Sequence, residues 1–317
     1  MDTPERTDDR VPTLPHPSVA ARPAQARVGR SLPVAVLVAV RPRQWVKNLL
    51  VLAAPLAAGQ VINPEIVPPI LAALVLFCAA ASGVYLLNDV RDLDQDRRHP
   101  VKRWRPIAAG DLPPRLALSL SAVLLLVAIV GGFAVTPALG AVLVVYVAVQ
   151  ACYAFWLKQE PVLDLACVAS GFLLRAIAGG AATGIALSEW FLLVAAFGSL
   201  FMVAGKRYSE IRTIGSEAGT RLSLQVYSAT YLRFVWTLAA GVTVTAYSLW
   251  ALHSQRAGEL PLQSISIVPF VLALLRYALD IDRGVADAPE DIVLGDRVLQ
   301  GVGAIWFLLV VIGVWQA

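Results

Sequence analysis

Nine apolar stretches of membrane-spanning length dominate this sequence. A helix that crosses the hydrocarbon core of a bilayer needs about 20 mostly apolar residues, and only a helix or a closed barrel can satisfy its own backbone hydrogen bonds there. The composition agrees, because 58% of the residues are hydrophobic and only 15% are charged. The sequence therefore predicts an all-α integral membrane protein with nine transmembrane helices, at residues 43–60, 66–88, 115–133, 137–157, 161–182, 189–205, 230–252, 264–281 and 297–316.

The first forty residues differ from the rest of the chain. They begin with a segment rich in Pro, Ala and Arg that has no apolar periodicity, which predicts a disordered arm. The following SLPVAVLVAV resembles the apolar core of a signal peptide, but no small-residue cleavage site follows it. We interpret it as an interfacial segment. The predicted organisation is an arm over residues 1–40 and a single nine-helix membrane domain over residues 41–317.

The basic residues favour one side of the membrane. Of the 26 lysines and arginines, all except Arg175 and Arg256 fall in the arm, in the connections after the second, fourth, sixth and eighth helices, or at the flanking helix ends. The positive-inside rule then places the amino terminus in the cytoplasm and the carboxyl terminus outside, in a multi-pass protein of the plasma membrane. The acidic clusters fall on the same side, so we expect a polar cavity that faces the cytoplasm.

The segment from Asn88 to Asp96, NDVRDLDQD, places four carboxylates directly after the second apolar stretch. Asp89, Asp92 and Asp96 are spaced i, i+3, i+7, which puts them on one face of a helix, whereas Asp94 points elsewhere. Stacked carboxylates repel one another unless a cation joins them, and hard oxygen ligands suit Mg²⁺ that bridges to substrate phosphates. These three aspartates are the candidate catalytic and metal-binding residues. The alternative is a solvated, charged helix end.

Cations and an amide near this motif suggest a binding site for phosphate groups. Lys102 and Arg105 follow it within a short loop, although orientation by positive charge alone would also explain them. In the first helix, Asn48 is costly one turn inside the membrane without a partner, so we favour a binding role for it and for the neighbouring Lys47. Lys158, the one cation after the fourth helix, is assigned to the same substrate site.

Two further helices carry charges at membrane depth. Asp164 lies near the start of the fifth helix and Arg175 about midway along it, too far apart for a direct bond. An unpaired Arg near the bilayer centre costs at least about 2.5 kcal/mol, so we expect both residues to line a common polar interior. The end of the sixth helix adds a charged cluster at the same depth, which we include in the substrate site: Lys206, Arg207, Tyr208 and Glu210.

The remaining titratable residues offer no other catalytic arrangement. The cysteines lack paired spacing and the histidines are scattered, so we expect neither a disulfide framework nor a His-based metal site or triad. Asp280, Asp282 and Asp296 are either substrate contacts or solvated loop acids, and the sequence does not separate the two.

The acidic motif resembles NDxxDxxxD, the first aspartate-rich motif of the UbiA superfamily of membrane prenyltransferases, with matches at Asn88, Asp89, Asp92 and Asp96. Longer stretches are similar to the branch of that superfamily that transfers a phosphoribosyl group: RPRQWVKNLLVLAAPLAAG, YLLNDVRDLDQDRRHPVKRWRPIAAG, LKQEPVLDLACVASGFLLRAIAGG and KRYSE. Typical superfamily members have a second aspartate-rich motif after the sixth helix. This chain has KRYSEIR there, with Glu210 as the nearby acid.

The resemblance implies a UbiA-like helical bundle and a Mg²⁺-dependent transferase. In the similar branch, phosphoribosyl diphosphate is the donor, a polyprenyl (decaprenyl) phosphate is the acceptor, and diphosphate is released. The product is a lipid-linked precursor of cell-wall arabinan. The resemblance also implies that the three motif aspartates hold the metal, that the nearby cations neutralise phosphate charge, and that the protein forms a homo-oligomer, a trimer. No nucleic-acid partner is expected.

Two other functions are compatible with the sequence. One is a prenyltransferase that moves an isoprenoid chain from its diphosphate onto an aromatic acceptor, which a second acidic pair near residues 210–220 would have favoured. The other is a non-enzymatic membrane carrier. Carriers often show inverted repeats and polar residues on both sides of the bilayer, and we find no such repeat here.

Overall fold

The computed structural model describes residues 29–214, 226–254, 260–283 and 295–316, so most of the predicted arm lies outside the described residues. Within these ranges the chain is helical and has no strand. Eight helices are long and apolar enough to cross a membrane: α3 (Val67–Arg91), α5 (Pro114–Val135), α6 (Pro137–Phe155), α7 (Leu163–Thr183), α8 (Glu189–Ile214), α10 (Ala229–His253), α11 (Leu262–Asp282) and α13 (Arg297–Gln316). They coincide with the second to ninth predicted stretches, which confirms an all-α, multi-pass membrane protein.

The first predicted stretch is not a regular α-helix. α1 (Leu32–Ala39) is followed by the 3₁₀-helix η1 (Pro42–Leu52) and the short α2 (Ala53–Ala57). The break falls at Arg41, whose φ of 54° lies in the left-handed region. Pro42 follows and has no backbone N–H to continue a helical ladder. The predicted single α-helix over 43–60 is wrong, because η1 occupies its first ten residues and α2 ends at Ala57. In the described part of the chain this segment is not among the eight candidate spans.

Close packing against α7 holds η1 in place. A Cβ atom at Gly179 would lie 2.0 Å from the carbonyl oxygen of Val51, so only glycine permits this approach. One turn earlier on α7, Nε of Arg175 donates to Oδ1 of Asn48 on η1 at 2.7 Å. These contacts fix the path of η1, and they thereby position Arg41, which precedes it.

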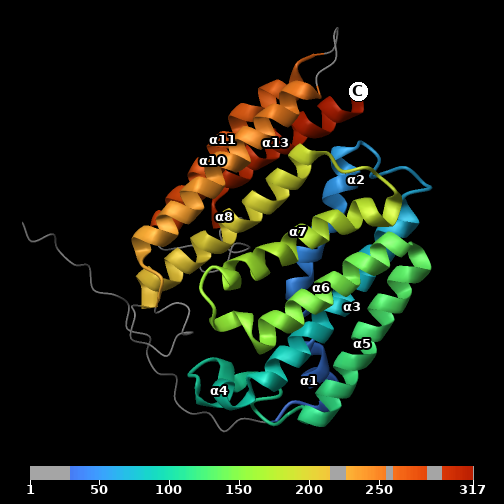
Figure 1. Ribbon diagram of the computed structural model, residues 1–317, viewed down its shortest axis with the longest axis vertical. Coiled ribbons are helices and arrows are strands. Elements are labelled where there is room, and N and C mark those ends of the chain that lie inside the picture. The colour runs from blue at the N-terminus through green and yellow to red at the C-terminus, as the bar shows by residue number, and fades with distance from the viewer. Residues whose placement is uncertain (1–28, 215–225, 255–259, 284–294, 317) are drawn as a thin grey trace, which may run out of the picture.

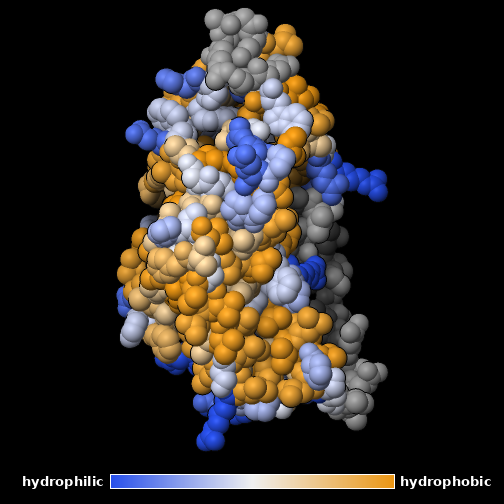
Figure 2. Space-filling model, turned by 90° about the vertical axis from the view of Figure 1, so that its right-hand side faces the viewer, coloured by the Kyte–Doolittle hydropathy of each residue, from blue (hydrophilic) through white to orange (hydrophobic). Residues whose placement is uncertain are grey.

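The long helices form two groups that meet where α7 packs on α8 (Figure 1). α3, α5, α6 and α7 enclose one apolar core, which includes Phe77 and Leu143. α8, α10, α11 and α13 contribute to a second core, which includes Phe201 and Leu232. Figure 2 shows a broad hydrophobic surface on the side where α5 lies. An exposed apolar surface of this kind suits contact with lipid.

The charged segments gather at one end of the helices. α3 leads into α4 (Leu93–Arg98) and the 3₁₀-helix η2 (Lys102–Trp104), and η3 (Leu157–Gln159) joins α6 to α7. In Figure 1, α4 lies at the lower edge and the end of α8 at the lower left. This end of the bundle therefore carries the segments from which the substrate site was predicted, apart from Arg175 on α7 and Lys47 and Asn48 on η1.

Candidate active site

The acidic motif bends in the middle. α3 ends just before Asp92 and α4 begins just after it, so the predicted uninterrupted helix is wrong. The bend still brings two carboxylates together. Nη1 of Arg105 donates to Oδ1 of Asp89 at 3.0 Å and to Oδ2 of Asp96 at 2.7 Å. The predicted proximity of Asp89 and Asp96 is therefore confirmed, and one guanidinium explains it.

Asp92 has a different partner. Its Oδ2 accepts a hydrogen bond from Nζ of Lys158 on η3. Asp94, by contrast, has a side chain that is 86% exposed and pairs loosely with Arg97 at 3.9 Å. Lys158, predicted as a substrate-binding residue, thus contacts the acidic motif, and Asp94 lies outside it.

A second guanidinium reaches the motif from the segment before η1. Nη2 of Arg41 donates to Oδ1 of Asp89 at 2.5 Å, and its guanidinium lies 4.8 Å from the ring centroid of Tyr85. Neither residue was among the predicted site residues. The available signal was the Arg-Pro pair at 41–42, because the residue before a proline is disfavoured in the α-helical region and often marks a helix boundary.

The carboxylates of the motif depend on these cations. Asp89 and Asp96 are 2% and 3% exposed. Burial raises the pKa of Asp96 above its ordinary value; Arg105 opposes this rise, Asp89 adds to it, and Lys102 opposes it again. Ionised carboxylates this deeply buried are stable only with compensating positive charge. Lys102, half-buried on η2, therefore belongs to the electrostatic environment of the site.

The donor set of the motif suits a hard divalent cation. Mg²⁺ is usually held by one or two carboxylates together with substrate phosphates and waters. Asp89 and Asp96 already converge on a single nitrogen, and Asp92 is close by in sequence. In the conformation described, no group of three or more such ligands within the described ranges is positioned to hold an ion. To hold a metal together, the three carboxylates of the motif would therefore have to lie closer to one another than they do here.

A second buried cluster joins α7 to α8. Asp164 is fully buried, accepts from the hydroxyl of Tyr227 at 2.5 Å, and lies 3.6 Å from Nε of Arg207. Nη1 of Arg207 donates to Oε2 of Glu210 at 2.8 Å, and Lys206 lies 3.9 Å from the same carboxylate. Four of the predicted site residues are thus brought together.

Tyr227 is a member of this cluster that the sequence did not reveal. Its hydroxyl also accepts from the backbone N–H of Val162, which has a φ of 69°. Burial and the hydrogen bond to Asp164 raise the pKa of Tyr227, so the phenol remains a proton donor to that carboxylate. Tyr227 therefore fixes the start of α7. The short segment from η3 to the first turn of α7 contains both Lys158, which contacts the acidic motif, and Asp164 of the second cluster. This segment therefore links the two clusters.

Arg175 and Asn48 form a separate network deeper in the bundle. Arg175 is 6% exposed and donates to Asn48 and to the hydroxyl of Tyr146, the latter at 3.0 Å. The amide of Asn48 also donates to Sγ of Cys78 at 3.2 Å. The expectation that Arg175 needs a partner is confirmed. The structure does not show the expected polar interior shared by Arg175 and Asp164. Asn48 was predicted to contact substrate, and in the structure it bonds to Arg175 and Cys78 and so helps to hold η1 in place.

Tyr208 belongs to a third cluster. Its hydroxyl donates to Oδ1 of Asp282 at 3.1 Å and accepts from Nη2 of Arg233 at 2.5 Å. Arg207, the preceding residue of α8, instead reaches the cluster around Asp164. The structure therefore does not bring Tyr208 together with the other predicted residues of this segment.

The other residues singled out in the sequence lie around these clusters. Asn88 is half-buried at the end of α3, and Lys47 is half-buried on η1. Asp296 accepts from Nε of Arg276 at 2.5 Å and caps the start of α13 through backbone N–H groups. Asp280 is buried at the end of α11. The ion pair with Arg276 and the helix cap therefore give Asp296 a structural role.

Known proteins resemble this chain over most of its length. The family model described as the UbiA prenyltransferase family matches residues 48–294. A decaprenyl-phosphate phosphoribosyltransferase of Mycolicibacterium smegmatis is 49% identical over 305 residues, which cover 92% of this chain and 95% of that protein. The protein of the same name from Mycobacterium tuberculosis is 51% identical over 285 residues, which cover 88% and 94%.

Solved structures share the fold. A UbiA homolog from Archaeoglobus fulgidus bound to DMAPP and Mg²⁺ matches with a TM-score of 0.68 over 88% of this chain and 97% of that chain, at 18% identity. The apo structure of a UbiA homolog from Aeropyrum pernix matches with a TM-score of 0.55 over 84% and 97%, at 15% identity. At these identities the likeness concerns the arrangement of the helices.

Proposed function

The chain belongs to the UbiA prenyltransferase family, and from this premise we infer that it is a membrane phosphoribosyltransferase. It transfers a 5-phosphoribosyl group from phosphoribosyl diphosphate to a polyprenyl phosphate, decaprenyl phosphate by analogy with its relatives, and releases diphosphate. The observation that carries this conclusion is 49% to 51% identity to decaprenyl-phosphate phosphoribosyltransferases over about nine-tenths of both chains.

The geometry supports a diphosphate donor at the acidic motif. Asp89 and Asp96, with Asp92, would hold Mg²⁺, which when bound neutralises charge on the diphosphate and makes it a better leaving group. Arg105 and Lys158 then exchange their carboxylate partners for phosphate oxygens, and Arg41 does the same. Guanidinium groups bind phosphate through strong charge-assisted hydrogen bonds, so the same cations serve both states.

The second cluster supports a monophosphate acceptor. Lys206 and Arg207 present cations near Glu210, at the place where typical family members carry a second acidic motif. A lipid phosphate is already ionised at neutral pH, so it needs positive charge to position it and no protein base to activate it. One of its oxygens attacks the anomeric carbon of the ribose as the bond from that carbon to the diphosphate breaks. Catalysis is then positioning together with charge stabilisation.

Membrane topology follows the charge distribution of the sequence. The active site and the amino terminus face the cytoplasm, the carboxyl terminus lies outside, and the broken segment α1–η1–α2 makes the ninth passage across the plasma membrane. Irregular backbone is tolerated at membrane depth where protein covers it, and the close contact of η1 with α7 provides that cover. The product is the lipid-linked precursor of cell-wall arabinan.

The test uses membranes that contain the full chain. Labelled phosphoribosyl diphosphate and polyprenyl phosphate are supplied with Mg²⁺, and the lipids are extracted. Asp92→Asn should lose lipid-borne label, whereas Asp94→Asn, in the same motif but exposed, should retain it. No Mg²⁺-dependent label with the wild type, or undiminished label with Asp92→Asn, would contradict the proposal. A parallel reaction with labelled prenyl diphosphate and aromatic acids tests prenyl transfer directly.

A further inference from the structure

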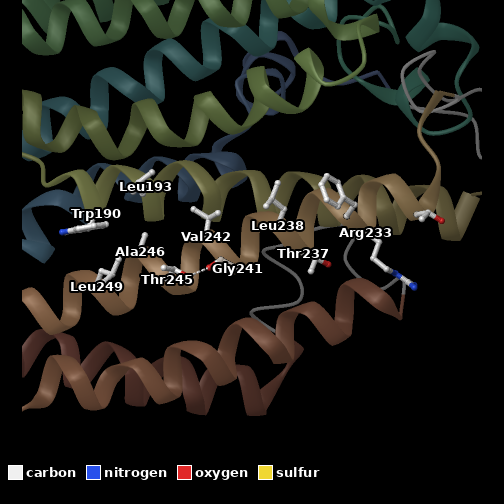
Figure 3. A pocket seen from close by; sticks show the side chains of 12 residues that line it. Trp190, Leu193, Arg233, Thr237, Leu238, Gly241, Val242, Thr245, Ala246 and Leu249 are labelled. Carbon is white, nitrogen blue, oxygen red and sulfur yellow. Dashed lines mark hydrogen bonds between the residues drawn. The ribbon is translucent and has the colours of Figure 1, made fainter.

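An apolar groove with a volume of 680 Å³ runs along α10 (Figure 3). Its wall is formed by side chains that recur every three or four residues on α10, from Thr230 to Leu249, and Trp190 and Leu193 of α8 lie at one end. At about 1.5 Å per residue, these positions on α10 span about 28 Å. The groove is therefore nearly as long as the hydrocarbon core of a bilayer is thick, about 30 Å.

The opposite end of the groove is positively charged. Arg233 lines it, and Nη2 of Arg233 lies 2.9 Å from Oδ1 of Asp282. Arg212 approaches the same oxygen at 3.8 Å, and both guanidiniums contact the hydroxyl of Tyr208. Among the residues that the structure describes, two guanidiniums thus share one carboxylate. Their side chains are 48% and 55% exposed, so they remain accessible to an anion.

This charged end lies on a different side of α8 from the cluster around Asp164. Tyr208 and Arg207 are consecutive residues of α8, and they serve different clusters: Tyr208 contacts Arg233, whereas Arg207 contacts Asp164. A phosphate bound at Arg233 would therefore lie beside the active site without occupying it.

We propose that this groove docks a polyprenyl phosphate, with the phosphate at Arg233 and Arg212 and the isoprenoid chain along α10. The excess positive charge selects an anionic headgroup, and the length of the groove selects the chain. The acyl chain of a phospholipid covers one leaflet, about half of the hydrocarbon thickness, whereas a long isoprenoid can follow the whole groove. The inference rests on the proposed function, because the lipid that it names is the proposed acceptor.

The experiment uses the full chain in phosphatidylcholine nanodiscs and a polyprenyl phosphate that carries a photoreactive diazirine in its chain. Gly241→Leu should block the groove, since a Cβ atom at Gly241 meets no atom within 4 Å and points into open space. Gly301→Leu on α13 is the matched control, because its Cβ atom is equally free. Arg233→Gln tests the headgroup site. We expect labelled peptides from α10, with about tenfold less label in Gly241→Leu and Arg233→Gln and unchanged label in Gly301→Leu.

Competition and activity separate the outcomes. Unlabelled polyprenyl phosphate should displace the probe, and the uncharged polyprenol should not. Equal displacement by phosphatidylglycerol would mean an unspecific anionic lipid site and would overturn the proposal, as would unchanged labelling in Gly241→Leu. A change of oligomeric state in Gly241→Leu without loss of label would show that the groove is a subunit interface. Because labelling needs no turnover, Asp92→Asn should be labelled normally; normal labelling of a wild type that transfers no phosphoribosyl group would instead refute the proposed function alone.

Discussion

Replacing Arg105 by Gln is expected to change metal binding and donor binding in opposite directions. In the structure one nitrogen of Arg105 bonds to both Asp89 and Asp96, at 3.0 and 2.7 Å. Under the proposed function, a metal ion would compete with that guanidinium for the two carboxylates, whereas the diphosphate would need the guanidinium as a partner. The variant should therefore bind Mn²⁺, used as a probe for Mg²⁺, more tightly in the absence of substrate, and phosphoribosyl diphosphate more weakly.

The size of both effects follows from the geometry. A hydrogen bond to a charged group contributes about 1.5 to 3 kcal/mol. The side chain of Arg105 is 29% exposed, so solvent screening places each effect near the lower end, about 2 kcal/mol or about 30-fold in a binding constant. Mn²⁺ binding is measured by electron paramagnetic resonance on purified protein, and the KM for the donor is measured in the lipid-extraction assay.

The neighbouring Arg103 provides the control. Its guanidinium lies over the ring of Trp104 and its side chain is exposed, so Arg103→Gln should leave both constants unchanged. If Arg105→Gln weakened Mn²⁺ binding, or left the KM for the donor unaltered, the idea that Arg105 exchanges carboxylates for phosphate would be refuted.

Three further outcomes are expected. Tyr227→Phe removes the hydroxyl from fully buried Asp164, which should lower stability by about 1 to 3 kcal/mol in thermal unfolding and reduce transfer; unchanged stability would contradict this role. Gly179→Ala should destabilise the protein by about 1 to 3 kcal/mol or more because its Cβ atom would meet the backbone of η1, whereas Gly198→Ala, with its nearest neighbour 3.7 Å away, should be tolerated. Burial raises the pKa of Asp96, so the folded protein without metal binds that proton more tightly than the unfolded chain does, and the contribution of Asp96 to stability falls as pH rises through the folded pKa. Metal binding needs the ionised form and should therefore weaken on acidification at a pH above the range of ordinary carboxyls; a profile identical to that of an exposed aspartate would disprove it.

The regular part of the fold was predictable because hydropathy reports directly on membrane spans. Eight predicted stretches became eight helices. The remaining stretch, the first along the chain, failed because residues 43–52 follow the 3₁₀ path of η1, where a close contact with Gly179 shapes the backbone, and because α2 ends at Ala57. The mean hydropathy of a stretch of sequence does not tell which helix will approach it. The contact between Gly179 of α7 and the carbonyl group of Val51, and with it the 3₁₀ path of η1, could therefore not be predicted from hydropathy.

The types of residue in the candidate site could be predicted from the sequence, but which residue contacts which could be predicted only in part. The spacing of the aspartates correctly suggested that Asp89 and Asp96 converge, although the bend at Asp92 was not foreseen. Tyr208 and Arg207 show the limit most clearly. Adjacent positions on a helix point about 100° apart, so one run of charged residues supplied two different clusters, on two different sides of α8. Only the positions of α7, α10 and α11 decide which side belongs to the active site.

The charge balance of the acidic motif explains why so many cations converge on it from distant segments. Asp89, Asp92 and Asp96 are matched by Arg41, Arg105 and Lys158, which come from three separate parts of the chain. Without such partners, buried carboxylates would take up protons and lose their value as metal ligands. Were these carboxylates to hold a metal, as the proposed function requires, the same three cations would be left facing a strongly anionic donor. The ion pairs therefore preserve the ionised carboxylates and hold the three cations in position at once, so under the proposed function substrate binding would be an exchange of partners within a preformed site.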